Sequence, residues 1–261
     1  MPEIIEVEVY RRLADRVTGR TVADVETPDA WYLKGGVRPA DVRDAAVGAR
    51  VEAVRRHGKL LLVDLGEERP VLGLRFGMTG RLVLDDHAPI ERLEYGPRRD
   101  DPKWNRFALV GADGSRLRMS DPRRLGGVEL DPDTTVLGMD AWSITERGLR
   151  DALVHGRAPL KARLLDQRRV AGLGNLLVDE TLWRAGLDPA RPAGTLEAGE
   201  IRTLQRRIRS TIRALDERGG SHTGDLQAQR HRDGVCPRDG VPLERRTIGG
   251  RTTYSCPVHQ R

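Results

Sequence analysis

The sequence has little cysteine and no long apolar run. Its only cysteines, Cys236 and Cys256, lie within the last 26 of 261 residues, which excludes a disulfide framework spread along the chain and favours a metal site. No stretch approaches the roughly 20 apolar residues that a membrane-spanning helix needs. The acidic start Met-Pro-Glu lacks the basic flank of a secretion signal. We therefore expect a cytosolic protein.

Lysine is also scarce, although the chain is basic. Four of the 45 basic residues are lysine and the other 41 are arginine, against 39 acidic residues, for a net charge of +6. The excess charge favours a polyanionic partner, and the planar guanidinium suits bidentate contacts with phosphate. Codon usage in a GC-rich genome explains the same composition, so charge alone does not assign a function.

The first half of the chain has the pattern of a β-rich domain. Ile5, Tyr10 or Val9, Leu13 and Val17 recur at helical spacing and predict an amino-terminal helix. Short β-rich runs follow at residues 50–54, 60–65, 71–76, 81–84, 107–110 and 116–119, with a hairpin turn at Asp113-Gly114. Several short strands with few helices indicate a β-sandwich.

The second half has a helical pattern. Turn-forming residues 131–133 separate the two patterns, so we predict an α+β protein with domains 1–135 and 136–261. Ser143 and Glu146 have the spacing of a capping box. Five apolar residues then form one helical stripe that ends at a glycine pair: Ile201, Leu204, Ile208, Ile212 and Leu215, before Gly219 and Gly220.

The carboxyl-terminal segment, residues 231–261, carries candidate metal ligands. They form two pairs, each with two intervening residues, and the pairs are 16 residues apart: Cys236 with Asp239, and Cys256 with His259. This is the spacing of a zinc ribbon that holds one structural Zn²⁺, with Gly249-Gly250 at the hairpin tip. Carboxylate is the least usual of these ligands, and His231 is the alternative to Asp239. A metal-free hairpin with two buried thiols is the alternative to a zinc site.

The amino terminus offers a nucleophile. Removal of Met1 would leave Pro2 with a free secondary amine, and an α-amino group titrates near pH ~7.7–8.0. A helix amino terminus lowers that value, so part of the amine is neutral and can attack an aldehydic sugar carbon to form a Schiff base. Glu3 lies beside it as a candidate acid or base. A proline and an acid in the first turn of an ordinary helix explain the same three residues.

Several motifs along the chain occur in the order of one known family. They are MPEIIEVE at 1–8, RHGKLLL at 56–62, GMTG at 77–80, DPRRLG at 121–126, VAGLGN at 170–175 running on to Asp179-Glu180, and the carboxyl-terminal ribbon. Together they resemble the formamidopyrimidine-DNA glycosylase and endonuclease VIII family over essentially the whole chain. The resemblance implies an amino-terminal β-sandwich with a helix, and a helix–two-turn–helix domain with a zinc ribbon.

The resemblance also implies an activity. Such an enzyme excises a damaged base from duplex DNA and cuts the abasic site by β-elimination, with or without δ-elimination, and needs no cofactor beyond structural zinc. Pro2 is implied as the nucleophile, and Glu3 as the group that assists ring opening and proton transfer. Lys59 is implied to contact phosphate and aid elimination. Arg251 is implied to contact phosphates near the lesion and to act in the second elimination.

Further residues match the DNA-contacting positions of that family. Met78, Arg123 and Leu125 match the positions that fill the gap left by a flipped base, and Arg124 lies in the same loop. An unbranched thioether also suits a protein core, which is the alternative for Met78. Lys161 and Asn175 match phosphate-contacting positions. The Gly172-Leu173-Gly174 turn before Asn175 is expected to present backbone N–H groups to a phosphate.

The chain departs from the family pattern at several positions. Ile4-Ile5 replaces the usual Leu-Pro, Leu125 replaces the phenylalanine of purine-oxidation enzymes, and Asp239 and His259 replace two cysteines. Residues 221–235 are too few for the loop that caps 8-oxoguanine. We therefore expect a nucleoid-associated, monomeric repair enzyme whose lesion is undetermined. A catalytically inactive or lyase-only protein that binds damaged DNA is the alternative.

Overall fold

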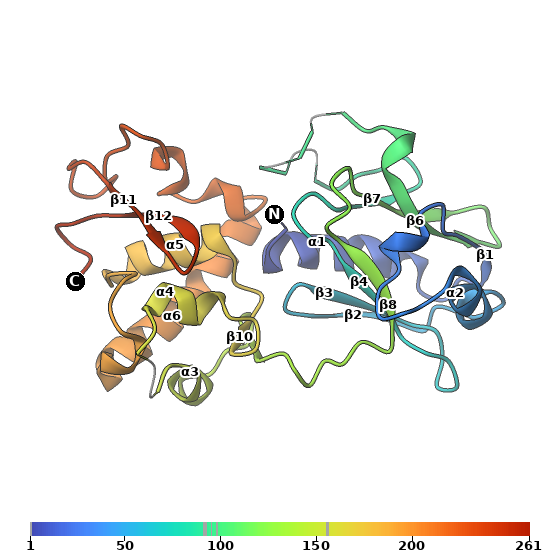
Figure 1. Ribbon diagram of the computed structural model, residues 1–261, viewed down its shortest axis with the longest axis horizontal. Helices are drawn as coiled ribbons and strands as arrows, with labels where there is room; N and C mark the ends of the chain where they lie inside the picture. Colours follow the sequence, from blue (N-terminus) through green and yellow to red (C-terminus); the bar gives the residue numbers. More distant parts are fainter. Residues whose placement is uncertain (1, 91–92, 95, 98, 155–156) are drawn as a thin grey trace. The chain divides into compact units, whose positions relative to one another are not determined.

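The chain folds as two compact units. The computed structural model describes residues 2–90, 93–94, 96–97, 99–154 and 157–261 (Figure 1). The amino-terminal unit contains Pro2 and Glu6–Thr134, and the carboxyl-terminal unit contains Glu3–Ile5 and Thr135–Arg261. Three residues at the start of the chain therefore belong to the second unit, which the sequence pattern did not indicate.

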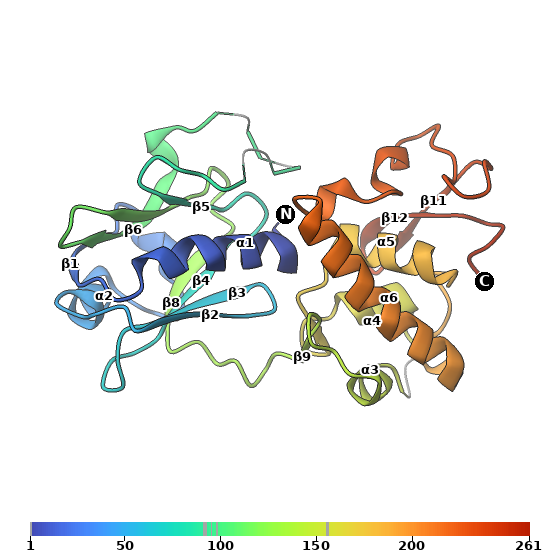
Figure 2. The same cartoon turned by 180° about the vertical axis from the view of Figure 1, so that it is seen from behind.

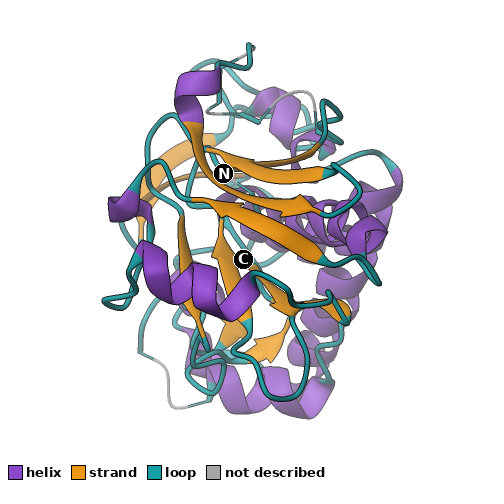
Figure 3. Cartoon of the chain, turned by 90° about the vertical axis from the view of Figure 1, so that its right-hand side faces the viewer, coloured by secondary structure: helices purple, strands orange, loops and turns teal. Residues whose placement is uncertain are grey.

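The amino-terminal unit is a β-sandwich, as predicted. Its elements are α1 (Ile4–Ala14), η1 (Asp15–Val17), β1 (Val22–Glu26), η2 (Ala30–Tyr32), α2 (Pro39–Ala46), β2 (Ala53–His57), β3 (Leu60–Asp64), β4 (Leu72–Arg75), β5 (Arg81–Leu84), η3 (Pro102–Trp104), β6 (Asn105–Gly111), β7 (Arg116–Ser120) and β8 (Gly127–Leu130). Two four-stranded antiparallel sheets have the orders β1-β6-β7-β5 and β2-β3-β4-β8 (Figure 3).

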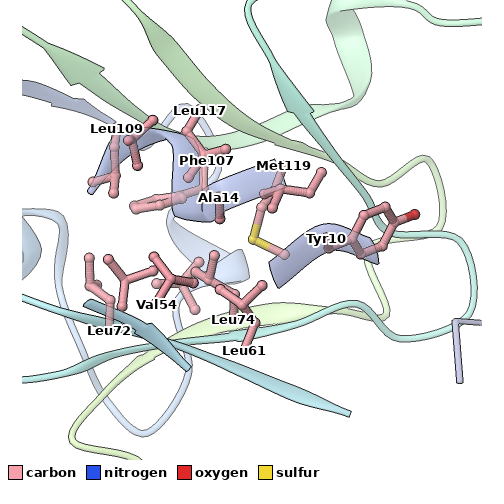
Figure 4. Packing of buried hydrophobic residues seen from close by; sticks show 14 of the residues in the cluster. Tyr10, Ala14, Val54, Leu61, Leu72, Leu74, Phe107, Leu109, Leu117 and Met119 are labelled. Atoms are coloured by element: carbon pink, nitrogen blue, oxygen red, sulfur yellow. The ribbon is translucent and has the colours of Figure 1, made fainter. Parts of the chain in front are cut away.

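The core of this unit lies between the two sheets. Figure 4 shows Phe107 and Met119 of the first sheet facing Leu61 and Leu74 of the second, with Tyr10 of α1 beside them. All five side chains are at least 98% buried. Burial of this apolar surface supplies the main favourable free energy of folding, and it holds the loops at the ends of the strands in place.

Two strands and one α-helix of this unit were not predicted. Strands β1 and β8 are short and carry charged residues or glycine, so neither has a strong alternating pattern. Helix α2 begins at Pro39, and Asp41 accepts a hydrogen bond from the Arg38 backbone N–H at 2.8 Å. A proline at the first helical position is a helix-start signal, and it was present in the sequence. Strand β2 also begins three residues later than the predicted run.

The carboxyl-terminal unit is mainly helical. Its elements are β9 (Met139–Asp140), α3 (Glu146–Leu153), α4 (Leu160–Leu165), β10 (Val170–Ala171), α5 (Asn175–Ala185), η4 (Ala193–Thr195), α6 (Ala198–Glu217), η5 (Ser221–Thr223), η6 (Gln227–Gln229), β11 (Glu244–Ile248) and β12 (Arg251–Ser255). Helix α6 packs on α5 (Figure 2). The five residues of the predicted stripe are buried on α6, and the chain turns at Gly219 and Gly220, both with positive φ.

The predicted capping box at Ser143 is wrong. Thr145 is the N-cap of α3, and its Oγ1 accepts a hydrogen bond from the Gly148 N–H at 3.1 Å. Ser143 is instead part of a turn that Asp140 organises, since its backbone N–H donates to the Asp140 carbonyl at 3.2 Å. Ile144 and the N-cap Thr145 therefore lie between Ser143 and the first helical residue, Glu146. Among the described residues, no helix is both long and apolar enough to cross a membrane.

Candidate active site

Glu3 is held at the amino terminus of α5. Its side chain is buried, and its carboxylate accepts hydrogen bonds from the backbone N–H groups of Gly174 at 2.8 Å, Leu176 at 2.9 Å and Leu177 at 3.1 Å. The first turn of a helix has N–H groups without partners and a positive partial charge, and a carboxylate satisfies both. This contact fixes the residue next to Pro2, which is itself buried.

The glycines of the Gly-Leu-Gly turn make room for that contact. A Cβ on Gly174 would lie 2.2 Å from Cδ of Glu3, and a Cβ on Gly172 would lie 2.5 Å from Cδ1 of Ile4. The Ile4 N–H also donates to the Gly172 carbonyl at 3.0 Å. The sequence suggested that this turn presents N–H groups to a DNA phosphate. In the structure, the Gly174 N–H of this turn donates to Glu3, and the Gly172 N–H donates to Oε1 of Gln167 at 2.9 Å.

Lys161 lies in the interior of the carboxyl-terminal unit. Its side chain is fully buried, and Nζ donates to Oδ1 of Asp179 at 2.6 Å and to the Thr252 carbonyl at 3.1 Å. Burial lowers the pKa of Lys161, and the charge of Asp179 partly opposes that effect. The structure therefore places Lys161 in an internal ion pair, and its phosphate contact stays a prediction. Arg230 pairs with the other oxygen of Asp179.

Asn175 contacts the residue that follows Arg251 in the ribbon. Asn175, the first residue of α5, donates through Nδ2 to the Thr252 carbonyl at 3.2 Å. Arg251 precedes Thr252 in β12, next to the Gly249-Gly250 tip of the β11–β12 hairpin, and is exposed. Lys161 and Asn175 thus both bind the second residue of β12, close to the hairpin tip, while Arg251 is exposed.

Lys59 occupies the turn between β2 and β3. The turn consists of Gly58 and Lys59, because His57 pairs with Leu60 across the hairpin. Arg56 supports it, since Nη1 donates to the Gly58 carbonyl at 2.9 Å and Nε donates to Glu8 at 3.1 Å. Lys59 is half-buried, so part of its side chain reaches solvent from a hairpin turn rather than from within a strand.

Two loops of the β-sandwich unit carry the remaining candidates. Met78 lies in the turn between β4 and β5, is half-buried, and stands outside the core cluster. Arg123 and Leu125 lie in the loop after β7 and are exposed, Leu125 by 49%. Arg124, between them, has a positive φ and binds both oxygens of Asp29 at 2.7 Å. Its guanidinium is therefore already engaged by a carboxylate.

Four side chains form a candidate metal centre in the carboxyl-terminal ribbon. The ligand atoms of Cys236, Asp239, Cys256 and His259 all lie within 4.8 Å of one another. Oδ2 of Asp239 is 3.3 Å from Sγ of Cys236 and 3.1 Å from Sγ of Cys256, and it also contacts Nδ1 of His259. His231 is not a member of this cluster. The four residues can hold one metal ion.

Groups around the cluster orient its ligands. The other ring nitrogen of His259 lies 3.1 Å from the Trp183 carbonyl, and the Trp183 indole N–H donates to Sγ of Cys236 at 3.3 Å. The Val258 N–H lies 3.4 Å from Sγ of Cys256. Such contacts fix the histidine tautomer and stabilise negative charge on sulfur, as around known metal sites.

Two acidic residues matter more than the sequence indicated. Asp121 begins the DPRRLG motif, and Asp179 follows the VAGLGN motif, but no role is predicted for either from the sequence. Both side chains are fully buried. A signal existed for each. Asp121 precedes Pro-Arg and accepts from the Arg123 N–H at 3.2 Å, as an aspartate at the start of a turn does. Asp179 follows three consecutive apolar residues of α5, Leu176, Leu177 and Val178.

Comparison with known proteins identifies the family. Residues 1–128 match the family model of the formamidopyrimidine-DNA glycosylase N-terminal domain, and residues 137–225 match that of the formamidopyrimidine-DNA glycosylase H2TH domain. A formamidopyrimidine-DNA glycosylase of Paracoccus denitrificans is 35% identical, with 100% of both chains aligned. The chain belongs to the formamidopyrimidine-DNA glycosylase family. A glycosylase of that name from Thermus thermophilus is 37% identical over 100% of this chain and 98% of its own.

Solved structures of the glycosylase family have the same fold. A complex between the Lactococcus lactis Fpg and an abasic site containing DNA has a TM-score of 0.83 at 25% identity and covers 99% of each chain. A complex between the LlFpg protein, a THF-DNA and an inhibitor has a TM-score of 0.82 at 25% identity and covers 100% of each chain. The two-domain arrangement that the resemblance implied is therefore confirmed.

Proposed function

We propose that this protein excises damaged bases from duplex DNA and cuts the resulting abasic site, with Pro2 as the nucleophile. Members of the family are bifunctional DNA glycosylases and abasic-site lyases. The observation that carries the proposal for this chain is the Glu3 carboxylate, which three N–H groups at the start of α5 hold in place. A surface acid in an ordinary helix needs no such binding site.

The proposed reaction begins after removal of Met1. The secondary amine of Pro2 attacks C1′ of the damaged nucleotide, the bond from C1′ to the base breaks, and the base leaves with a proton. The sugar ring opens, and an iminium ion joins Pro2 to C1′. Loss of a C2′ proton then expels the 3′ phosphate, which is β-elimination. Water releases the sugar and regenerates the amine.

We assign supporting roles to three further side chains. Glu3 is placed to transfer a proton at the sugar ring, because its contacts with α5 restrict its orientation. Lys59 reaches solvent from a rigid hairpin turn and is suited to a phosphate contact. Arg251 is exposed at the ribbon tip, where its guanidinium can bind a phosphate near the lesion. Asn175 is proposed as a further phosphate contact.

We also propose that the ribbon binds one structural Zn²⁺. Two thiols, one imidazole and one carboxylate oxygen form a donor set that suits tetrahedral zinc, and the contacts of Trp183 with Cys236 and His259 support it. When bound, the metal joins the turn that carries Cys236 and Asp239 to the turn that carries Cys256 and His259. It thereby stabilises a hairpin that is too small for a core of its own.

Borohydride trapping tests the proposed nucleophile. Protein whose Met1 is shown by mass spectrometry to be removed is incubated with a duplex carrying one abasic site, and the imine is reduced to a stable adduct. We expect the adduct to map to Pro2, and Pro2→Gly to lower the trapping rate by roughly 100-fold or more while DNA affinity is kept. A parent adduct that maps to a residue other than Pro2 would refute the assignment.

A panel of duplexes then ranks substrates. The same protein is tested on 8-oxoguanine, a formamidopyrimidine and thymine glycol, each placed in one duplex sequence. Excision of at least one lesion is expected. Binding of all duplexes without excision or trapping would instead favour the damage-binding alternative, and trapping without excision would favour the lyase-only alternative.

A further inference from the structure

The buried carboxylate of Asp121 joins the two loops that carry the wedge candidates. Oδ1 of Asp121 accepts a hydrogen bond from the Thr79 hydroxyl at 2.6 Å, and Oδ2 accepts from the Gly126 N–H at 2.8 Å. Thr79 belongs to the turn with Met78, and Gly126 follows Leu125. Both Thr79 and Asp121 are fully buried. One carboxylate therefore connects a turn between β4 and β5 to the loop after β7.

Asp121 is itself fixed from several directions. Its backbone N–H donates to the Trp104 carbonyl at 2.8 Å, and its carbonyl accepts from Nε of Arg106 at 2.9 Å. The buried Tyr32 hydroxyl donates to Oδ2 at 3.3 Å. Burial, and next the charge of Asp121, raise the pKa of Tyr32 well above its ordinary value, so the hydroxyl keeps its proton and remains a donor.

The two loops are also in direct backbone contact. Gly77 has a φ of +55°, and a Cβ there would lie 2.4 Å from the carbonyl carbon of Leu125. On the far side of the turn, the Tyr10 hydroxyl donates to the Gly80 carbonyl at 3.4 Å. Contacts at Gly77, Thr79 and Gly80 leave little freedom for the backbone of Met78, although its side chain is half-buried and reaches solvent.

We propose that Thr79, Asp121 and Tyr32 form a loop clamp, and that Asp121 acts through it as a positioning residue for base extrusion. The inference rests on the proposed function. A side chain that enters a base stack must resist the force of restacking, and two independent surface loops would yield to it. The loop clamp makes Met78, Arg123 and Leu125 one rigid wedge, because either loop can move only if a buried carboxylate loses its donor.

Thr79→Val and Thr79→Ser form a matched pair that tests the clamp. Valine keeps the shape of threonine but removes the donor to Asp121, whereas serine keeps the donor. Each variant is incubated with a duplex that contains the lesion that the parent excises best, with 2-aminopurine as the neighbouring base. The fluorescence of 2-aminopurine rises when the neighbouring base unstacks. We expect Thr79→Val to lower both the unstacking rate and single-turnover excision by about tenfold, as for loss of a hydrogen bond to a charged group. Thr79→Ser should behave like the parent.

Trapping at a preformed abasic site separates the clamp from the chemistry. An abasic nucleotide has no base to extrude, so Thr79→Val should trap it within about twofold of the parent rate. Failure of the parent to trap would be failure of the proposed function, not of the clamp. The clamp is overturned if Thr79→Val extrudes and excises like the parent, if Thr79→Ser loses as much as Thr79→Val, or if trapping falls as far as excision.

A second variant covers the case in which Thr79→Val does not fold. Tyr32→Phe removes a different donor to Asp121 and keeps the ring. It should lower unstacking and excision in the same direction by a few-fold, with trapping retained. Parent-like unstacking and excision by Tyr32→Phe, in that case, would overturn the clamp.

Discussion

At the scale of single residues, three buried carboxylates differ in the groups that neutralise or bind them, and those groups determine what each carboxylate does. Glu3 is bound by backbone N–H groups at a helix terminus, Asp179 by the cations of Lys161 and Arg230, and Asp121 by hydroxyl and N–H donors from two loops. A buried charge is tolerated only with such partners. Each carboxylate therefore ties together segments that are distant in the sequence.

Gly174→Ala should displace Glu3 without straining the backbone. Gly174 has φ −124° and ψ −169°, which alanine adopts, but the new Cβ would overlap the Glu3 carboxyl group. We expect a loss of about 1–3 kcal/mol in the free energy of urea unfolding, as for other overpacked sites, together with slower trapping at an abasic site. Gly199→Ala is the control, because no atom lies within 4 Å of its Cβ. Parent-like stability and trapping in Gly174→Ala would contradict this account of Glu3.

At the scale of elements, helix α5 organises the carboxyl-terminal unit. Its first turn binds Glu3, its middle carries Asp179 for the ion pair with Lys161, and its last turns place Trp183 against the candidate metal ligands. The β11–β12 hairpin depends on the ion pair with Lys161, because Lys161 also donates to the Thr252 carbonyl of β12. One helix thus relates the start of the chain to the ribbon near its end.

Metal content tests the ribbon. We expect one zinc per chain by atomic absorption, and almost none in Cys256→Ser, because loss of a thiolate opens the site. Removal of zinc by a chelator should unfold the hairpin and abolish cleavage, since Arg251 lies on it. His231→Ala is the control and should keep its zinc. Zinc retained by Cys256→Ser, or lost by His231→Ala, would mean that the ligand set is different.

At the scale of the whole molecule, the net charge is +6, but many arginines form ion pairs with carboxylates of the same chain. Five arginines each bind both oxygens of one carboxylate through two guanidinium nitrogens: Arg55, Arg75, Arg116, Arg124 and Arg191. Such arginines add little to a phosphate-binding surface while they remain paired. The number of phosphates that the protein neutralises is therefore smaller than its arginine content suggests.

The salt dependence of DNA binding distinguishes exposed cations from buried ones. The slope of log Kobs against log salt concentration is about −0.9 for each phosphate neutralised. We expect Arg251→Ala to reduce the size of this slope by about one. Lys161→Met should leave the slope unchanged, because Lys161 is buried against Asp179. Circular dichroism checks that both variants are folded. A reduced slope in folded Lys161→Met would instead mean that Lys161 contacts a phosphate, as the sequence suggested.

Residues that are close in the sequence were the most predictable. The stripe on α6, the Gly249-Gly250 tip and the paired ligands of the ribbon all follow from local spacing, and the structure has each of them. The order of the motifs was enough to indicate the family. Strands β1 and β8 were missed because neither has a strong alternating pattern of its own, and pairing with distant strands forms them.

The sequence by itself determined the two-part organisation, the helix periodicity and the residue types available for chemistry, because these depend on local pattern and composition. Only the tertiary structure decided which polar groups are satisfied internally. It placed Lys161 in an ion pair, gave the Gly174 N–H and two N–H groups of α5 to Glu3, and joined two loops through Asp121. Burial and long-range hydrogen bonding set these outcomes, and both arise from contacts between residues up to 174 positions apart.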